Sequence, residues 1–330
     1  MAAERYLIIG SNSFSGAHCV AGLLQAGAEV VGISRSPQPD VMFLPYRWMP
    51  HERFQFHALD LNRDLDAIEA VIRQFRPAYI INFAAQGMVA QSWAHPEHWF
   101  QTNTVAMVRL HDRLRKMDFL KKYVHISTPE VYGTCSGLVQ ETAPYNPSTP
   151  YAASKAACDM CLMAFKQAYG FPVVFTRVAN VCGPGQQLYR IIPKTILCIL
   201  TGKKLKLEGG GHSVRSFIHI RDVIDGTIRV AREGPPGEIY HLATDKNQTI
   251  RELVMKICRQ MGVAFEDCIQ VTEARLGQDS AYLLDCTKAR NELGWEPVLT
   301  IEDVIGETVD WLKKNLDRAR NVPAEYIHKE

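Results

Sequence analysis

The sequence has no excess of charge of either sign. Lys and Arg number 37 and Asp and Glu number 35 in a chain of 330 residues, a formal net charge of +2. This balance gives no electrostatic reason to expect a nucleic acid or a membrane surface as a partner, although a local site for an anionic group stays compatible with it.

The sequence also lacks a membrane-spanning hydrophobic run and a secretion signal at its start; residues 5–10 already have the pattern of a strand. A disulfide framework is missing too, because the nine cysteines are an odd number scattered along the chain. We therefore expect a cytoplasmic enzyme with reduced thiols. Cys158 and Cys161 are spaced as in a metal site, but no second pair lies nearby, so we expect them to pack and predict no metal.

What is present is a regular alternation of apolar β-branched runs and helix-length segments. We expect strands at residues 7–9, 30–33, 79–82, 123–126 and 173–175, and helices at 64–75, 102–117 and 151–169. The last helix should begin at Ser148-Thr149-Pro150, where a hydroxyl can cap free amides and proline fits the first turn. This pattern predicts an α/β fold with a doubly wound parallel sheet.

The alternation fades after residue 178, where glycine- and proline-rich breaks separate shorter elements. A chain of this length has room for two packed lobes. We expect a first domain over residues 1–178 and a smaller α/β lobe over 179–330, with some strands at about 217–243 returning to the main sheet.

A glycine-containing turn follows the first strand and opens a helix, but it lacks its usual middle glycine. Gly10 and Gly16 flank Ser13 and Phe14 where backbone amides and a helix N-terminus can bind a pyrophosphate. Serine at position 13 weakens the match, because glycine there lets the main chain approach the phosphates; a shifted loop or an added hydroxyl contact is expected.

The second strand ends without the acidic residue that usually binds the adenosine ribose of NAD. Arg35, between Ser34 and Ser36, suits a 2′-phosphate, so we favour NADP over NAD as the cofactor. Two later segments are expected along the same cofactor: Asp60 and Leu61 beside the adenine, and Ala84, Ala85 and Gln86 beside its other half.

A carboxylate, a phenol and an ammonium group occur in two neighbouring segments. Thr128 and Glu130 lie in the first; Tyr151 and Lys155 lie in the second, four residues apart and so on one face of a helix. A neighbouring cation favours the phenolate, so we expect Lys155 to lower the pKa of Tyr151. Glu130 offers a second, separate base.

These pieces, in this order, resemble the extended short-chain dehydrogenase/reductase family, and within it the nucleotide-sugar 4,6-dehydratases that act on dTDP-glucose or GDP-mannose. Residues 147–157 (PSTPYAASKAA) are similar to the family's PSSPYSASKAS, residues 180–184 (NVCGP) to its NNYGP turn, and residues 293–297 (LGWEP) to its ending. The resemblance covers nearly the whole chain. It implies a Rossmann-type cofactor domain followed by a nucleotide-sugar-binding lobe.

Glu130 separates the reactions within this family. The family's 4-epimerases have small hydroxyl residues in this segment, whereas its 4,6-dehydratases carry Thr-Asp-Glu or Thr-Ser-Glu. Thr128-x-Glu130 therefore indicates elimination or decarboxylation. Pro129 departs from the pattern, because it cannot donate the proton that the middle aspartate gives to the departing C6 hydroxyl; Glu130 or a bound water would have to serve.

The resemblance implies a tightly bound cofactor that is regenerated in each cycle. Tyr151 takes the O4 proton while a hydride leaves C4, and the resulting ketone acidifies the C5 proton. Glu130 removes that proton, water leaves from C6, and the hydride returns to C6. Thr128 would steady O4, and Lys155 would hold the nicotinamide ribose.

The resemblance also suggests residues around the sugar nucleotide. Asn180 and Arg215 are the candidates for its pyrophosphate, Met88 stands where related dehydratases have a histidine and would shape the sugar pocket, and Asp279 belongs to the substrate lobe. The two helices at 102–117 and 151–169 imply a homodimer through a four-helix bundle.

Three other functions stay open at this point. A UDP-glucuronate-type decarboxylase would use the same Tyr151 and Lys155 with Arg215 for the substrate carboxylate; a nucleotide-sugar 4-epimerase fits less well because of Glu130. A non-catalytic NADP-binding module is suggested by Ser13 and Pro129.

Overall fold

A parallel sheet forms the centre of the protein, as seen in a computed structural model that describes residues 3–50, 52–135, 137–178, 180–273 and 283–328. Its seven strands have the order β12-β7-β5-β4-β1-β2-β3, and every neighbouring pair is parallel. The strands are β1 (Arg5–Ile9), β2 (Glu29–Ser34), β3 (Phe54–Ala58), β4 (Tyr79–Asn82), β5 (Lys122–Ile126), β7 (Val173–Val178) and β12 (Ile239–Leu242). The predicted doubly wound α/β fold is confirmed.

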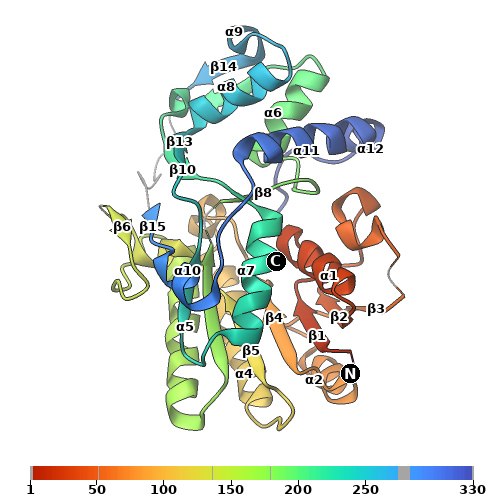
Figure 1. Cartoon of the computed structure of the whole chain (residues 1–330), viewed down its shortest axis with the longest axis vertical. Helices are drawn as coiled ribbons and strands as arrows, with labels where there is room; N and C mark the ends of the chain where they lie inside the picture. The colour runs from red at the N-terminus through yellow and green to blue at the C-terminus, as the bar shows by residue number, and fades with distance from the viewer. Residues whose placement is uncertain (1–2, 51, 136, 179, 274–282, 329–330) are drawn as a thin grey trace.

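Helices cover both faces of this sheet, as Figure 1 shows for its lower part. α1 (Phe14–Gln25) and α7 (Ile220–Glu233) share one hydrophobic core with the sheet, and α2 (Leu65–Phe75), α4 (Met107–Leu114) and α5 (Pro150–Tyr169) share the other. Burial on both sides explains why the central strands are apolar runs without alternation.

Strand order reverses between β1 and β4, because the chain passes outward from β1 to β2 and β3 and then returns to β4. In open α/β sheets, ligands bind outside the carboxyl ends of the strands at such a reversal. The expected site therefore lies beyond Ile9 and Asn82, the last residues of these two strands.

Helix α5 begins and ends as its sequence predicts. Thr149 caps it, since its hydroxyl accepts a hydrogen bond from the Ala152 amide at 3.1 Å, and Pro150 occupies the first helical position. Gly170 ends the helix with a left-handed φ of 66°. These caps fix where Tyr151 and Lys155 stand relative to the sheet.

The predicted helix at 102–117 is only partly regular. Residues Gln101–Ala106 form a π-helical turn, η4, between α3 (Pro96–Phe100) and α4. Wide turns of this kind concentrate at functional sites. Here the turn carries Asn103, whose side chain bonds to a neighbouring loop and to α5.

A second group of elements packs above the carboxyl ends of the sheet, at the top of Figure 1, around cores of its own. Its elements are α6 (Ile191–Leu200), β9 (Leu205–Glu208), β10 (Val214–Ser216), β13 (Asn247–Thr249), α8 (Ile250–Gln260), α9 (Phe265–Cys268), β14 (Ile269–Thr272), α11 (Ile301–Lys314) and α12 (Leu316–Arg320).

Two short parallel ladders lie outside both of these groups. β8 (Val181–Cys182) pairs with β11 (Ile218–His219), and β6 (Leu138–Val139) pairs with β15 (Leu283–Leu284), which leads into α10 (Thr287–Leu293). Of the region 217–243, β12 lies in the main sheet and β11 does not. In the described residues, no helix combines the length and apolar character that a bilayer crossing needs.

Candidate active site

A cavity of about 330 Å³ opens at the carboxyl ends of β1, β2 and β4. Eight residues predicted to bind the cofactor line it: Gly10, Ser13, Arg35, Asp60, Leu61, Ala84, Ala85 and Gln86. They come from four separate loops that only the sheet brings together. The other predicted members do not line the cavity. Phe14 and Gly16 lie in the first turn of α1, and Tyr151 and Lys155 lie on α5.

The glycine loop keeps its close approach in spite of the serine. A Cβ on Gly10, which has φ of 82°, would lie 2.7 Å from the Ala84 amide, and one on Gly16 would lie 2.1 Å from the Gly10 carbonyl. Ser13 has φ of −72°, which any residue adopts, and its hydroxyl caps α1 by accepting from the Gly16 amide at 3.1 Å. Serine therefore stabilises the helix N-terminus, where a phosphate would bind.

The strand-end segment 34–36 also faces this cavity. Ser34, Arg35 and Ser36 line it, so a guanidinium and a hydroxyl stand where the adenosine ribose of a dinucleotide lies in this fold. The Ser34 hydroxyl accepts a hydrogen bond from the Asn12 amide at 2.9 Å, and so ties the glycine loop to β2. The four loops and the helix N-terminus fit a dinucleotide.

The segment after β5 places Thr128 and Glu130. Residues Pro129–Tyr132 form a 3-10 turn, η5, in which the Thr128 hydroxyl accepts from the Glu130 amide at 3.3 Å. Pro129 is buried at the first position of this turn, where its missing N–H needs no partner. Proline therefore has a structural role at the position of the expected acid.

Tyr151 reaches the same segment from α5. Its phenol hydrogen bonds to Thr128, and the carboxylate of Glu130 lies close enough to act on it. Burial raises the pKa of Tyr151, the Glu130 charge raises it further, and the Thr128 hydrogen bond opposes both. The pKa of Tyr151 is thus raised on balance, with desolvation as the largest cause, and the expected lowering by Lys155 stays a prediction.

Lys155 is buried one turn further along α5. Its ammonium donates to the Ile126 carbonyl at 2.7 Å and lies 3.3 Å from His125 Nε2. Burial lowers the pKa of Lys155. The ammonium group is thus anchored to the end of β5, beside the segment that holds Thr128.

A buried polar network holds the segment of Thr128 and the helix of Tyr151 in register. Asp159, two turns beyond Tyr151 on α5, accepts from the Ser127 hydroxyl at 2.6 Å and from Arg177 Nη2 at 3.1 Å. Asp159 and Arg177 are fully buried. Removing one partner of such a pair typically costs roughly 3–5 kcal/mol, so the contact strongly favours one arrangement of the Thr128 segment against α5.

Asn103 makes a second link, and sequence reasoning did not find it. Its side-chain oxygen accepts from the Gln86 amide at 2.8 Å, while its amide group donates to the Gln86 carbonyl at 3.0 Å and to the Ser154 hydroxyl at 3.0 Å. Asn103 therefore joins the cavity wall to the helix of Tyr151. The sequence pattern predicts a regular helix here, so it gave no reason to expect this link from an asparagine.

The predicted substrate residues are only partly brought together. Asn180 donates to the Ser216 carbonyl at 2.9 Å, and so lies beside Arg215 on β10. Arg215 is half-buried and donates to the Val214 carbonyl at 2.7 Å. Met88 is half-buried in the loop after β4 and does not line the cavity. Asp279 lies outside the described residues.

Arg190 is a functional candidate that the sequence analysis missed. It is the N-cap residue of α6, its side chain is exposed, and its charge acts on the phenol of Tyr151 to lower its pKa. The signal was available, since an arginine follows the Gly183-Pro184-Gly185 turn and precedes a helix. A cation this close to Tyr151 is suited to an anionic substrate.

The fold and this site define a nicotinamide-dependent enzyme of the extended short-chain dehydrogenase/reductase class. The sequence profile described as GDP-mannose 4,6 dehydratase matches residues 7–308, and the chain belongs to that family. A dTDP-glucose 4,6-dehydratase from Xanthomonas campestris pv. campestris is 34% identical over 268 residues, covering 75% of this chain and 76% of the relative. The predicted family and the nucleotide-sugar 4,6-dehydratase activity are confirmed.

Solved structures agree with this family. A dTDP-glucose 4,6-dehydratase from Bacillus anthracis in complex with NAD has a TM-score of 0.86 at 30% identity, over 96% of this chain and 98% of that one. A UDP-glucose 4-epimerase from Thermotoga maritima with UDP-glucose has a TM-score of 0.85 at 26% identity, over 94% and 99%. Because dehydratase and epimerase share the fold, the choice between reactions depends on residues such as Glu130.

Proposed function

We propose that this enzyme converts a nucleoside-diphosphate hexose to the 4-keto-6-deoxyhexose, and that Thr128, Glu130, Tyr151 and Lys155 carry the reaction. The observation that supports this most is the meeting of Thr128 and Glu130 with Tyr151, which puts a carboxylate beside the phenol that would act on O4. A 4-epimerization needs no such carboxylate, whereas an elimination needs a base at C5.

When bound, the nicotinamide supplies the oxidation at C4 and the reduction at C6. Tyr151 takes the O4 proton, and Thr128, already bonded to the phenol, orients O4. Lys155, whose ammonium group donates to the Ile126 carbonyl, would hold the cofactor ribose. Glu130 then removes the C5 proton, which the C4 ketone has made acidic.

The departing C6 hydroxyl also needs a proton. Pro129 has none to give and is buried in η5. We propose that Glu130 returns the proton it took from C5, directly or through a bound water. One carboxylate then serves as base and as acid. After the hydride has returned to C6, C5 takes a proton from solvent through Glu130, and Tyr151 releases the O4 proton to solvent, so the protons balance over the cycle.

Two isotopic measurements test this function. In D₂O the product is expected to carry deuterium at C5, and a substrate labelled with deuterium at C4 is expected to give product labelled at C6 without dilution. Absence of C4 to C6 transfer would contradict a dehydratase. Release of CO₂ from a uronic-acid nucleotide would favour the decarboxylase instead, for which Arg190 near Tyr151 offers a cation.

We propose that the sugar nucleotide lies between the two parts of the chain, divided at residues 1–178 and 179–330. Its pyrophosphate would contact Asn180, Arg215 and Arg190. The hydrogen bond from Asn180 to the Ser216 carbonyl places Asn180 beside β10, which carries Arg215, and Arg190 stands at the start of α6. Contacts of Met88 and Asp279 with the sugar itself stay predictions. The nine free thiols support the cytoplasm as the place of action.

We further propose NADP as the preferred cofactor, because Arg35 faces the cavity where NAD-binding relatives place an acidic residue. Replacing Arg35 by alanine is expected to weaken NADP binding roughly ten- to hundredfold and to change NAD binding little, since one charge-assisted hydrogen bond is lost. Titration of the purified protein, stripped of cofactor, with each dinucleotide measures this.

Arg47→Ala is the matched control, because Arg47 is exposed, belongs to the same region and does not line the cavity. It should leave both affinities unchanged. Tighter binding of NAD than of NADP by the unaltered enzyme would overturn the cofactor proposal and leave the dehydratase function untouched.

We propose a homodimer through a four-helix bundle that includes α5. Met160 and Met163, three residues apart on its outer face, are 54% and 37% exposed, so this helix presents two neighbouring apolar side chains that a partner helix would cover. Replacing both by glutamate should convert the dimer to a monomer, as light scattering would show, because two charges would be buried in the interface.

The exposed Met255 on α8 offers a control, and Met255→Glu should leave the mass unchanged. A monomeric mass for the unaltered protein, or a dimer that survives both substitutions on α5, would contradict the proposed interface.

A further inference from the structure

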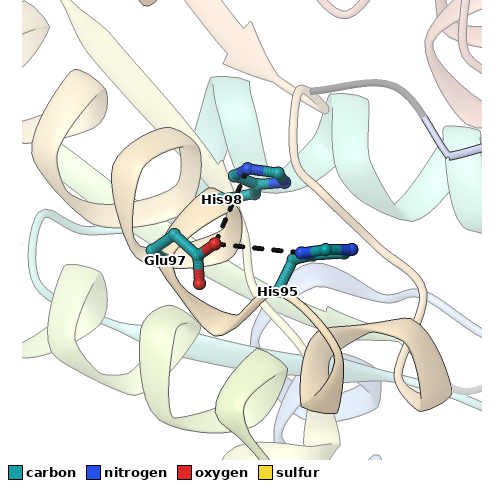
Figure 2. A group of neighbouring side chains, drawn as sticks. All are labelled: His95, Glu97 and His98. Atoms are coloured by element: carbon teal, nitrogen blue, oxygen red, sulfur yellow. Dashed lines mark ion pairs between the residues drawn. The ribbon is translucent and has the colours of Figure 1, made fainter.

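Two histidines and a glutamate converge at the start of α3, away from the groups used above. His95 Nδ1 lies 3.9 Å from Glu97 Oε1, and His98 Nε2 lies 3.8 Å from the same oxygen. Figure 2 shows this carboxylate oxygen between the two imidazole rings. All three donor atoms lie within 4.8 Å of one another.

Imidazole nitrogen and carboxylate oxygen are a donor set that zinc and similar divalent transition metals bind. A tetrahedral ion with bonds of about 2.1 Å places its ligand atoms about 3.4 Å apart, so the two distances from histidine to glutamate exceed this by roughly 0.5 Å, while all three donors lie within 4.8 Å of one another. The side chains of His95 and Glu97 are largely exposed, so small rotations can bring the donors together.

The backbone already holds these three residues close together, so binding an ion would cost little conformational entropy. His95 is the N-cap residue of α3, and Pro96 holds the first helical position. All three donors come from four consecutive residues, so the chain closes only a very short loop around an ion.

A third histidine, distant in sequence, supports the same conclusion. His98 Nδ1 lies 3.0 Å from His328 Nε2, and the His328 ring stacks on the buried Trp99 with 5.1 Å between centroids. Histidines that bind metals usually use their second nitrogen in such a hydrogen bond, which fixes the ring and its tautomer. His328 thus leaves His98 Nε2 to face Glu97.

Among the described residues that line the dinucleotide cavity, none belongs to this group. The contact does, however, join α3 to the C-terminal segment of the chain, where Tyr326 stacks edge-on against Tyr189, the neighbour of Arg190. An ion here would strengthen the hold of α3 on a segment next to the proposed substrate site.

We propose that His95, Glu97 and His98 form a binding site for one divalent transition-metal ion of the zinc type, with His328 as the residue that orients His98. The site differs from the expectation of no metal, which considered only cysteine spacing. It is structural in character, because its three ligands lie outside the catalytic groups, with water completing the coordination.

Calorimetric titration of the tag-free protein with Zn²⁺, repeated with Co²⁺ and followed by visible absorption, tests the site. We expect one ion per chain and a Co²⁺ spectrum without a sulfur charge-transfer band. The double variant His95→Ala/His98→Ala should weaken binding at least a hundredfold, and His328→Ala roughly tenfold, the usual effect of losing an outer hydrogen-bond partner. Glu97→Gln should weaken binding without disturbing the fold, because Glu97 is exposed.

His212→Ala, an exposed histidine on the other part of the chain, is the matched control and should bind Zn²⁺ normally. No Zn²⁺ binding by the unaltered protein would overturn the proposal. So would binding that survives the double variant, or a Co²⁺ spectrum dominated by sulfur, since either result would move the ion to the cysteines.

Discussion

Replacing Tyr151 by phenylalanine is expected to lower kcat by roughly a thousandfold, because the phenol is the group proposed to take the O4 proton and general base catalysis contributes about 10²–10⁴. The ring would keep its packing and lose only the hydroxyl that bonds to Thr128. Initial rates of 4-keto-6-deoxy product formation, with substrate at saturation, measure the effect. Substrate affinity should change little.

Tyr169→Phe is the matched control, because Tyr169 ends the same helix with an exposed side chain. It should leave kcat within the error of the assay. A Tyr151→Phe enzyme that keeps more than a tenth of its activity would show that another base takes the O4 proton, and the proposed role would be wrong.

The Glu130→Gln enzyme should lose elimination while keeping oxidation at C4. Product formation is expected to fall by about 10²–10⁴, since the C5 proton would have no base. Quenching the reaction with borodeuteride should then trap the 4-ketohexose as two C4 epimers labelled at C4. Deuterium exchange from solvent into C5 should disappear along with the product.

The same variant tests the electrostatics of the site. The Glu130 charge raises the pKa of Tyr151, so removing that charge should lower this pKa and move the rise of C4 oxidation with pH to lower pH. Glu233→Gln, an exposed change at the end of α7, should alter neither the product nor the pH profile. Normal C5 exchange by Glu130→Gln would contradict the assigned base.

Much of the fold could be predicted because its signals are local. The apolar runs from Tyr6 to Ile9 and at Val30 and Val31 are buried on both faces, and such runs between helix-length segments are typical of a parallel sheet. Thr149, Pro150 and Gly170 mark the limits of α5 because each acts on its own helix end.

Features that depend on distant contacts were harder to predict. The turn at Gln101–Ala106 is π-helical, and its Asn103 bonds to Gln86 and Ser154, which no helical periodicity reveals. The upward pKa shift of Tyr151 depends on burial, which a phenol four residues from a lysine does not disclose. Arg190 has a sequence signal in its place between a glycine-proline turn and a helix, but its effect on Tyr151 exists only in the folded chain.

Glu130 and the Tyr151-Lys155 pair could be identified from the sequence alone. A reaction needs particular functional groups, and each residue type specifies its own functional group. Their meeting is a property of the folded protein. Asp159 and Ser127 hold the end of β5 against α5, and their hydrogen bond joins residues 32 positions apart. The same holds for His328 beside His98, 230 positions away. Contacts of such separation follow from how the sheet and its helices pack, and no local pattern encodes them.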